Sequence, residues 1–203
     1  MAKFEELHTL VSAYAPNVPD FVAGNAIREA ARQFFRKTHS YIVCTPVGLS
    51  EGENIGVVEP YEADIEILAT LSIELDGEPI TVKTALPHYV NQSGKPRYYI
   101  GDTKDQVRFY PTADKPYDMV ARIAVRPSFT ATELDDELVS ENEEALRYGA
   151  LMILKSQVAT EWFSPEEISY YKNLFDQQIN QKRIDALKRF TNVTPTVPIR
   201  SFH

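Results

Sequence analysis

Apolar residues recur with helical spacing at both ends of the chain, whereas the long segment between the ends follows the period of β-strands. The spacing predicts a short helix over Phe4–Ala15 and an amphipathic helix over Phe21–Thr38, preceded by the capping residue Asp20. Basic residues in the last turn of the second helix suit the negative end of its dipole. Pro16 and Pro19 separate the two helices.

Two further helices are predicted near the C-terminus, from Asp136 to about Phe163 and from Pro165 to about Phe190. Ser164 and Glu167 have the spacing of a capping box, and Pro165 occupies the first position of the last helix, where its missing N–H costs nothing. One side of the preceding helix consists largely of small residues, so we expect another helix to pack closely against it: Ala145, Gly149, Ser156 and Ala159.

The central segment predicts strands that are joined by turns. Asp76 and Gly77 favour the positive φ angles of a tight hairpin turn. Alternation of apolar and polar residues from Met119 to Arg126 predicts one buried and one wetter strand face. The predicted strands, which would form a small antiparallel sheet or sandwich, are Tyr41–Thr45, Ile65–Leu75, Ile80–Thr84, Arg97–Ile100, Gln106–Tyr110 and Asp118–Arg126.

Neither pair of terminal helices can bury its apolar stripes alone, so both ends of the chain are expected to complete one bundle. The predicted fold class is α+β, a helical bundle formed by N-terminal and C-terminal helices with an inserted antiparallel β module. The predicted limits are residues 1–40 and 128–190 for the discontinuous bundle and 41–127 for the β module. The apolar residues of segment 191–203 follow neither helical nor strand periodicity, which predicts an extended C-terminal arm.

Composition narrows the functional classes. The net charge of −8 argues against general affinity for nucleic acid, which requires a concentrated basic surface. Charged residues interrupt the most hydrophobic stretch, so no segment is expected to span a membrane. Cys44 is the only cysteine, and Met1–Leu10 resembles no secretory signal, so we expect folding in a reducing cytoplasm.

Two sets of residues suggest chemistry, but each has a simpler interpretation. Cys44 with His39 could act as nucleophile and base, yet nothing marks an oxyanion hole, and a structural cysteine is favoured. Glu62, Asp64 and Glu66 alternate and could attract calcium, although a solvated strand face explains them more simply. We therefore predict that the protein is not an enzyme and has no catalytic residues, metal or cofactor.

A mixture of aromatic and basic residues in the central segment would suit stacking of single-stranded nucleic acid. A sheet core with cationic rims explains the same mixture and fits the negative net charge better. The residues concerned are Tyr98, Tyr99, Phe109 and Tyr110 beside Lys95, Arg97, Lys104 and Arg108.

Three stretches together resemble the neck proteins of tailed bacteriophages. Asn25–Thr38, with its Ala-Ile-Arg-Glu-Ala-Ala run before aromatic and basic pairs, is similar to their early helix. Val125–Ser128, followed by an acidic lead-in and Tyr148–Leu151, resembles their strand-to-helix return. Trp162–Pro165, with the following helix containing Tyr170, Tyr171 and Phe175, resembles their closing helix.

The resemblance implies a head-to-tail adaptor similar to the tail tubular adaptor of short-tailed phages. Such an adaptor is a structural virion protein of the neck, assembled in the host cytoplasm as a ring, usually dodecameric, and without a membrane. Its implied partners are copies of itself, the portal protein, a tail or nozzle protein, and genomic DNA that passes without specific binding.

Two groups of residues acquire hypothetical roles from this resemblance. The C-terminal arm of such adaptors commonly docks on the portal, which here implicates Thr191, Val193, Pro195, Val197, Pro198, Ile199, Arg200 and Phe202. An acidic channel surface would let DNA slide past, and the residues hypothesised to form it are Asp135, Asp136, Glu137, Glu141, Glu143 and Glu144.

Other functional classes stay open at this point. Another phage assembly protein, such as a tail-completion or minor capsid component, would form a different ring or fail to bind the portal. A small hydrolase would depend on Cys44 or on the carboxylates from Glu62 to Glu66. A host-encoded binding module would stay monomeric.

Overall fold

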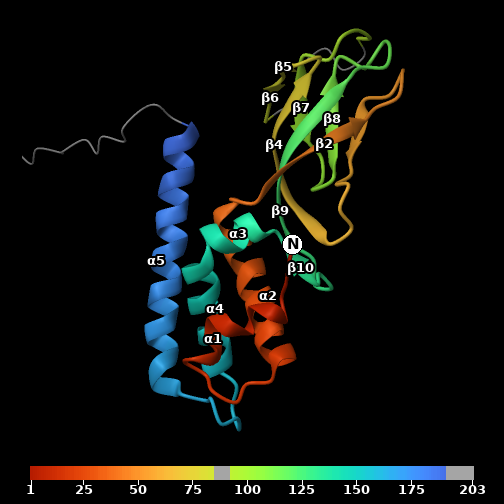
Figure 1. Cartoon of the computed structure of the whole chain (residues 1–203). Coiled ribbons are helices and arrows are strands. Elements are labelled where there is room, and N and C mark those ends of the chain that lie inside the picture. Colours follow the sequence, from red (N-terminus) through yellow and green to blue (C-terminus); the bar gives the residue numbers. More distant parts are fainter. Residues whose placement is uncertain (85–91, 191–203) are drawn as a thin grey trace, which may run out of the picture.

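The computed structural model describes residues 1–84 and 92–190. A layer of helices occupies one end of the molecule and a strongly curved sheet occupies the other (Figure 1). The helical elements are the short 3-10 helix η1 (Glu6–His8), α1 (Thr9–Ser12), α2 (Asp20–Thr38), α3 (Asp136–Glu141), α4 (Glu143–Lys155) and α5 (Pro165–Phe190).

Among the described residues, eight strands form one sheet in the order β5-β4-β9-β2-β3-β8-β7-β6. These strands are β2 (Ile42–Gly48), β3 (Ile55–Val58), β4 (Ile65–Leu75), β5 (Glu78–Pro79), β6 (Thr81–Val82), β7 (Tyr98–Gly101), β8 (Gln106–Tyr110) and β9 (Met119–Pro127). Two short strands, β1 (Ala2–Lys3) and β10 (Glu133–Leu134), pair separately.

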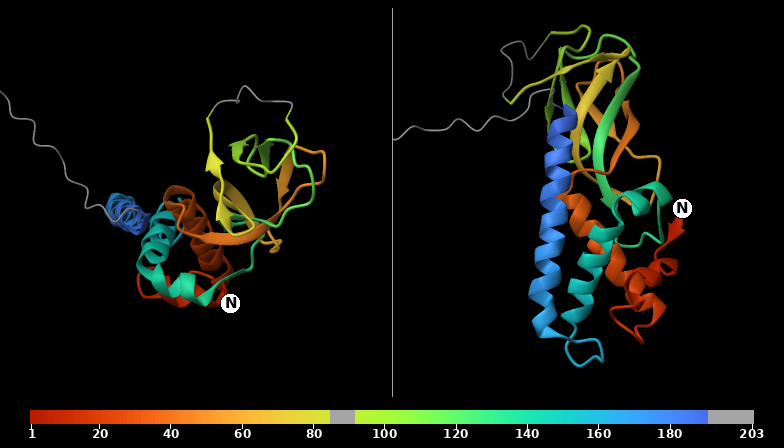
Figure 2. Two further views of the ribbon diagram at one scale, coloured as in Figure 1. Left: turned by 90° about the horizontal axis from the view of Figure 1, so that it is seen from above. Right: turned by 60° about the vertical axis from the view of Figure 1, so that its left-hand side comes forward.

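One continuous segment connects the two edges of the large sheet. β5 pairs with β4 at one edge, and β6 pairs with β7 in parallel at the other edge, with only Ile80 between them. The Ile80 N–H donates to the Ile73 carbonyl at 2.9 Å, and the Lys83 N–H donates to the Tyr99 carbonyl at 2.9 Å. The sheet therefore curls into a near-closed barrel, as the view from above shows (Figure 2).

The predicted fold class was wrong. The strands form a mixed eight-stranded, barrel-like sheet, and this sheet is a principal part of the molecule where a small antiparallel module was expected. Two features hid this sheet in the sequence. Strand β3 is short and contains Gly56, a residue type that weakens a strand pattern, and β6 has a parallel partner that local patterns do not reveal. The proposed limits of the separate units stay a prediction.

Helix α2 and the hairpin after β4 confirm the local predictions. Helix α2 spans Asp20–Thr38, close to the expected range, with nine buried residues along its inward face. Asp76 and Gly77 have φ angles of 52° and 81° and join the paired residues Leu75 and Glu78. These positive angles match the tight turn that connects twisted antiparallel strands.

The helix predicted from Asp136 to about Phe163 was wrong in its extent. It breaks at Asn142, a buried residue whose side-chain amide donates to the Leu138 carbonyl at 2.7 Å. Helix α4 then ends at Lys155, and Ala159 lies in a turn with a φ angle of 65°. The expected helix over Phe4–Ala15 is likewise divided into η1 and α1.

A single hydrophobic core continues from the helices into the sheet. Phe34 of α2 packs against Phe175 of α5, with 6.3 Å between ring centroids. Its neighbour Phe35 contacts Tyr41, which leads into β2, at a centroid distance of 5.4 Å. Consecutive phenylalanines on α2 thus anchor the outer helix on one side and the start of the sheet on the other.

Candidate functional site

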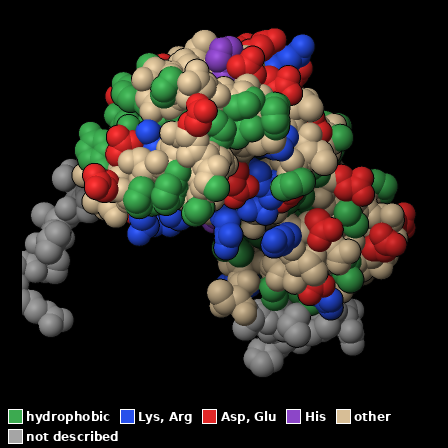
Figure 3. Space-filling model, turned by 90° about the horizontal axis from the view of Figure 1, so that it is seen from below, with side chains coloured by type: hydrophobic (Ala, Val, Ile, Leu, Met, Phe, Trp, Pro, Cys, Tyr) green, Lys and Arg blue, Asp and Glu red, His purple; other side chains and the backbone are tan. Residues whose placement is uncertain are grey.

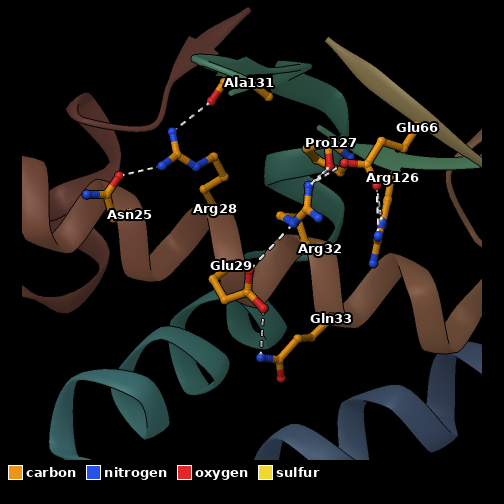
Figure 4. Close-up of polar contacts among 9 residues, drawn as sticks. All are labelled: Asn25, Arg28, Glu29, Arg32, Gln33, Glu66, Arg126, Pro127 and Ala131. Atoms are coloured by element: carbon orange, nitrogen blue, oxygen red, sulfur yellow. Dashed lines mark hydrogen bonds and ion pairs between the residues drawn. The ribbon is translucent and has the colours of Figure 1, made fainter. Parts of the chain in front are cut away.

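The junction between α2 and the sheet is a network of ion pairs centred on Glu66 of β4 (Figure 4). Arg32 of α2 donates from Nη1 to Glu66 Oε1 at 2.9 Å and to the Pro127 carbonyl at 2.9 Å. Arg126 of β9 donates from Nε to Glu66 Oε2 at 2.9 Å. Both carboxylate oxygens are therefore engaged, each by a different element of the fold.

This environment changes the proton affinity of the Glu66 carboxyl group. Burial raises its pKa, but hydrogen bonds and attraction from Arg32 and Arg126 outweigh burial, so the pKa lies below its ordinary value. The ion pair consequently persists throughout the neutral and mildly acidic range. The network fixes the orientation of the helices relative to the sheet.

The same face of α2 carries a second arginine that braces the loop after β9. Arg28 donates to the Asn25 side-chain oxygen at 2.6 Å and to the Ala131 carbonyl at 3.2 Å (Figure 4). The guanidinium groups of Arg28 and Arg32 lie 5.7 and 5.9 Å from the ring centroid of Phe129. These contacts hold the loop although Phe129 itself is 71% exposed.

The acidic residues predicted to form one channel surface separate into two groups. At the start of α3, the Asp135 side chain accepts a hydrogen bond from the Glu137 N–H at 2.8 Å, and Asp136 pairs with the Met1 ammonium at 2.7 Å. The hydrogen bond that the ammonium donates to Asp136, together with the nearby acids, raises the pKa of that ammonium, although partial desolvation opposes this effect. This group stays exposed at the surface.

The second acidic group faces other helical residues. Glu141 accepts from Lys182 of α5 at 3.1 Å, and Glu144 accepts from Gln178 at 2.9 Å. Glu143 forms an ion pair with Arg147 on its own helix. These contacts fix α3 and α4 against α5, so part of the negative charge is already compensated within the chain. The channel role of the six residues stays a prediction.

The residues considered for catalysis and calcium binding do not converge. Cys44 is exposed on β2, while His39 caps the end of α2 in a left-handed conformation. Glu62 and Asp64 lie in the turn before β4, and Glu66 is held by arginines. Within the described residues, no group of three or more His, Cys, Asp or Glu side chains is arranged to hold a metal ion.

The aromatic residues considered for nucleic-acid stacking lie mainly inside the sheet. Tyr99, Phe109 and Tyr110 are buried, and only Tyr98 is partly accessible. Burial raises the pKa of the Tyr99 hydroxyl. The core interpretation is therefore the one that the structure supports, because buried rings cannot present a stacking face.

A groove that the sequence did not indicate lies between α5 and the outer face of the sheet. It has a volume of about 340 Å³ and brings together three separate parts of the chain. Viewed from below, the molecule is hollowed between the helices and the sheet, and Lys and Arg side chains gather around this hollow (Figure 3). The residues that line the groove are His39, Ser40, Ile42, Arg122, Lys182, Asp185 and Ala186.

The predicted C-terminal arm, residues 191–203, lies outside the described residues. Its eight residues implicated in portal docking therefore remain a prediction. Helix α5, which leads to the arm, is described as a helix to Phe190.

Comparison with known families identifies the family of this chain. The sequence matches the family described as SU10 adaptor protein over residues 2–198, nearly the whole chain. The chain belongs to the SU10 adaptor protein family. This family comprises phage head-to-tail adaptors, so the resemblance to neck adaptors is confirmed. No curated protein matches the sequence.

Membership of the SU10 adaptor family makes the chain a structural phage adaptor and, by implication, a component of the virion neck. Among the described residues, no helix combines the length and apolar character needed to cross a membrane.

Proposed function

We propose that copies of this chain form a closed, dodecameric ring between the portal and the tail of a phage. Genomic DNA passes through the ring without specific binding. The observation that carries this proposal is the family match over residues 2–198. The net charge of −8 supports it, because an acidic protein repels DNA phosphates and leaves the duplex free to move.

The architecture is suitable for a ring subunit. A closed ring requires heterologous contacts, in which one face of a subunit meets a different face of the next. Helices lie along one flank of the molecule, and the N-terminus lies on the other side of α2 (Figures 1 and 2). The two flanks are therefore built from different elements, as a rotationally closed assembly demands.

Two surfaces have assigned roles in this proposal. The C-terminal arm, residues 191–203, docks on the portal protein, while the acidic group from Asp135 to Glu144 contributes to the channel wall. The opposite side of the ring contacts a tail or nozzle protein. Assembly takes place in the host cytoplasm and the product resides in the virion neck.

The sharpest test removes the arm and leaves the described fold intact. A variant that ends at Phe190 should keep its thermal unfolding midpoint and its circular dichroism spectrum, because the described hydrophobic core draws on residues up to Ile179, all of which the variant retains. Electron microscopy of the variant mixed with the cognate portal should show no docked ring, whereas the full-length protein should form one. Normal docking by the shortened chain would refute the role of the arm.

A further inference from the structure

The groove beside α5 contains an arginine that has no counter-ion among the described residues. Arg122 projects from the outer face of β9 and, within the described part of the chain, forms no side-chain hydrogen bond or ion pair. Lys182, which is already paired with Glu141, and His39 also line the groove, together with the carboxylate of Asp185. Ile42 and Ala186 add an apolar surface to the same hollow. Such a groove suits an acidic segment that carries one apolar anchor.

The turn between β3 and β4 has the complementary character. Tyr61 is 82% exposed, the highest value for a large apolar side chain among the described residues. Three carboxylates surround it in sequence, and within the described residues Glu59, Glu62 and Asp64 form no ion pair. We refer to residues 59–64 as the Tyr61 loop.

The Tyr61 loop is held at both ends by the rest of the fold. The Glu59 carbonyl accepts a hydrogen bond from the Thr45 hydroxyl, and the Asp64 carbonyl accepts one from the Ser128 N–H at 2.7 Å. The Tyr41 hydroxyl donates to Glu62 at 3.3 Å. A loop fixed in this way presents Tyr61 with little further loss of conformational entropy on binding.

The groove and the Tyr61 loop lie on different flanks of the molecule. A hollow lined by Met1, Glu62 and Asp64 places the loop beside the N-terminus. The N-terminus and α5 lie on opposite sides of α2 in two views (Figures 1 and 2). The two features therefore cannot satisfy each other within one copy, but they can do so between neighbouring copies.

We propose that the Tyr61 loop of one copy docks in the groove beside α5 of the next copy. Tyr61 packs against Ile42 and the Arg122 guanidinium, while Glu62 and Asp64 approach Arg122. An aromatic anchor in a pocket with opposite charges at its rim is the arrangement that dominates affinity in protein interfaces. This inference rests on the proposed ring and names the contact that closes it.

Charge reversal in the groove tests the contact in the full-length protein. Arg122→Glu should weaken self-association about tenfold or more, because like charges then face each other across the interface. Tyr61→Ala should weaken it by a similar factor through loss of the anchor. Analytical ultracentrifugation measures both effects. The matched controls are Lys104→Glu and Tyr170→Ala, which alter an exposed charge and an exposed ring elsewhere.

A mixing experiment tests whether the two features meet each other. One variant carries Arg122→Glu and keeps its loop; the other carries Tyr61→Ala, Glu62→Gln and Asp64→Asn and keeps its groove. Each alone should stay monomeric at concentrations where the wild type assembles. Their mixture should form one-to-one pairs that grow no further, since only one intact contact is available.

The outcomes separate this inference from the proposed function. If the wild type stays monomeric alone and with portal, the ring itself is refuted, and with it this contact. If the wild type forms rings and all groove and loop variants do so normally, the ring stands and this contact is refuted. If Arg122→Glu leaves assembly intact but abolishes binding of a duplex oligonucleotide, the groove binds phosphate and the inference is equally refuted.

Discussion

At the scale of single residues, Glu66 connects the helical layer to the sheet. Arg32 from α2 and Arg126 from β9 approach its carboxylate from two elements, and Arg32 also binds the Pro127 carbonyl. Arg32 is the most enclosed of the three side chains, with 12% exposure, so its charge depends on these partners. Loss of Glu66 leaves two neighbouring cations without their shared counter-ion.

We expect Glu66→Gln to lower the free energy of unfolding at pH 7 by on the order of 1 kcal/mol, a figure discounted for the partial exposure of the carboxylate. The pKa of Glu66 is lower in the folded state than in the unfolded state. The contribution of Glu66 to the free energy of unfolding is therefore complete above the unfolded-state pKa of about 4.3, and it disappears as the pH falls through the folded-state pKa. Urea denaturation at several pH values measures this difference.

A matched control for this substitution lies on the same strand. Glu74→Gln removes a β4 carboxylate that, within the described residues, forms no ion pair or side-chain hydrogen bond. Its effect on unfolding should be small, because no ion pair is lost. A difference between wild type and Glu66→Gln that stays constant down to pH 2 would show that the ion pairs contribute nothing.

At the scale of elements, the close approach of α2, α4 and α5 depends on Gly149. A Cβ atom at this position would lie 2.8 Å from Ala30 Cβ and 2.9 Å from the Phe175 ring. The small-residue stripe predicted from sequence is therefore confirmed at this position as a close helix contact. The helices could not keep this spacing around any larger side chain, because interiors are already densely packed.

Gly149→Ala should destabilise the protein although alanine favours helices. The gain in helix propensity is about 1 kcal/mol, whereas overpacking costs about 1–3 kcal/mol, so we expect a net loss on the order of 1 kcal/mol. Differential scanning calorimetry should show a lower unfolding midpoint. Gly48→Ala serves as control, because its Cβ would meet its nearest neighbour at 3.8 Å. A raised midpoint for Gly149→Ala would contradict the packing argument.

At the scale of the whole molecule, the near-closed sheet leaves little free edge near the turn after β4. Residues 78–79 pair with β4 and residues 81–82 pair with β7, so this segment bridges the two edges. The surface available for assembly therefore consists mainly of side chains. Within the exposed acidic group at the start of α3, Asp135 and Asp136 are fixed by the helix cap and the N-terminus. Their place in the proposed channel wall leads to a test in the assembled virion.

A variant that combines Asp135→Asn, Asp136→Asn and Glu137→Gln should release its genome more slowly and have lower infectivity. A less acidic wall repels DNA less, so the duplex slides past it less freely. Release of DNA from purified virions that carry the variant measures the effect. A virion with Glu51→Gln, Glu53→Gln and Glu78→Gln has the same change in net charge at other exposed sites. Equal release from all virions would count against an acidic channel surface.

The sequence alone determined the elements that are specified by neighbours along the chain. Helix α2 followed from its apolar stripe, β9 from the alternation of its apolar and polar residues, and the hairpin turn from the Asp76-Gly77 pair, because each signal acts over a few residues. Family membership followed from the resemblance of helical stretches.

Only the tertiary structure decided how distant segments meet. The near-closed barrel depends on β6 pairing with β7 in parallel, and the helix break at Asn142 depends on burial of its amide. The Glu66 junction and the groove at Arg122 likewise draw residues from elements far apart in the chain. Local periodicity specifies which face of an element is apolar, but the partner of that face is chosen by packing of the whole chain.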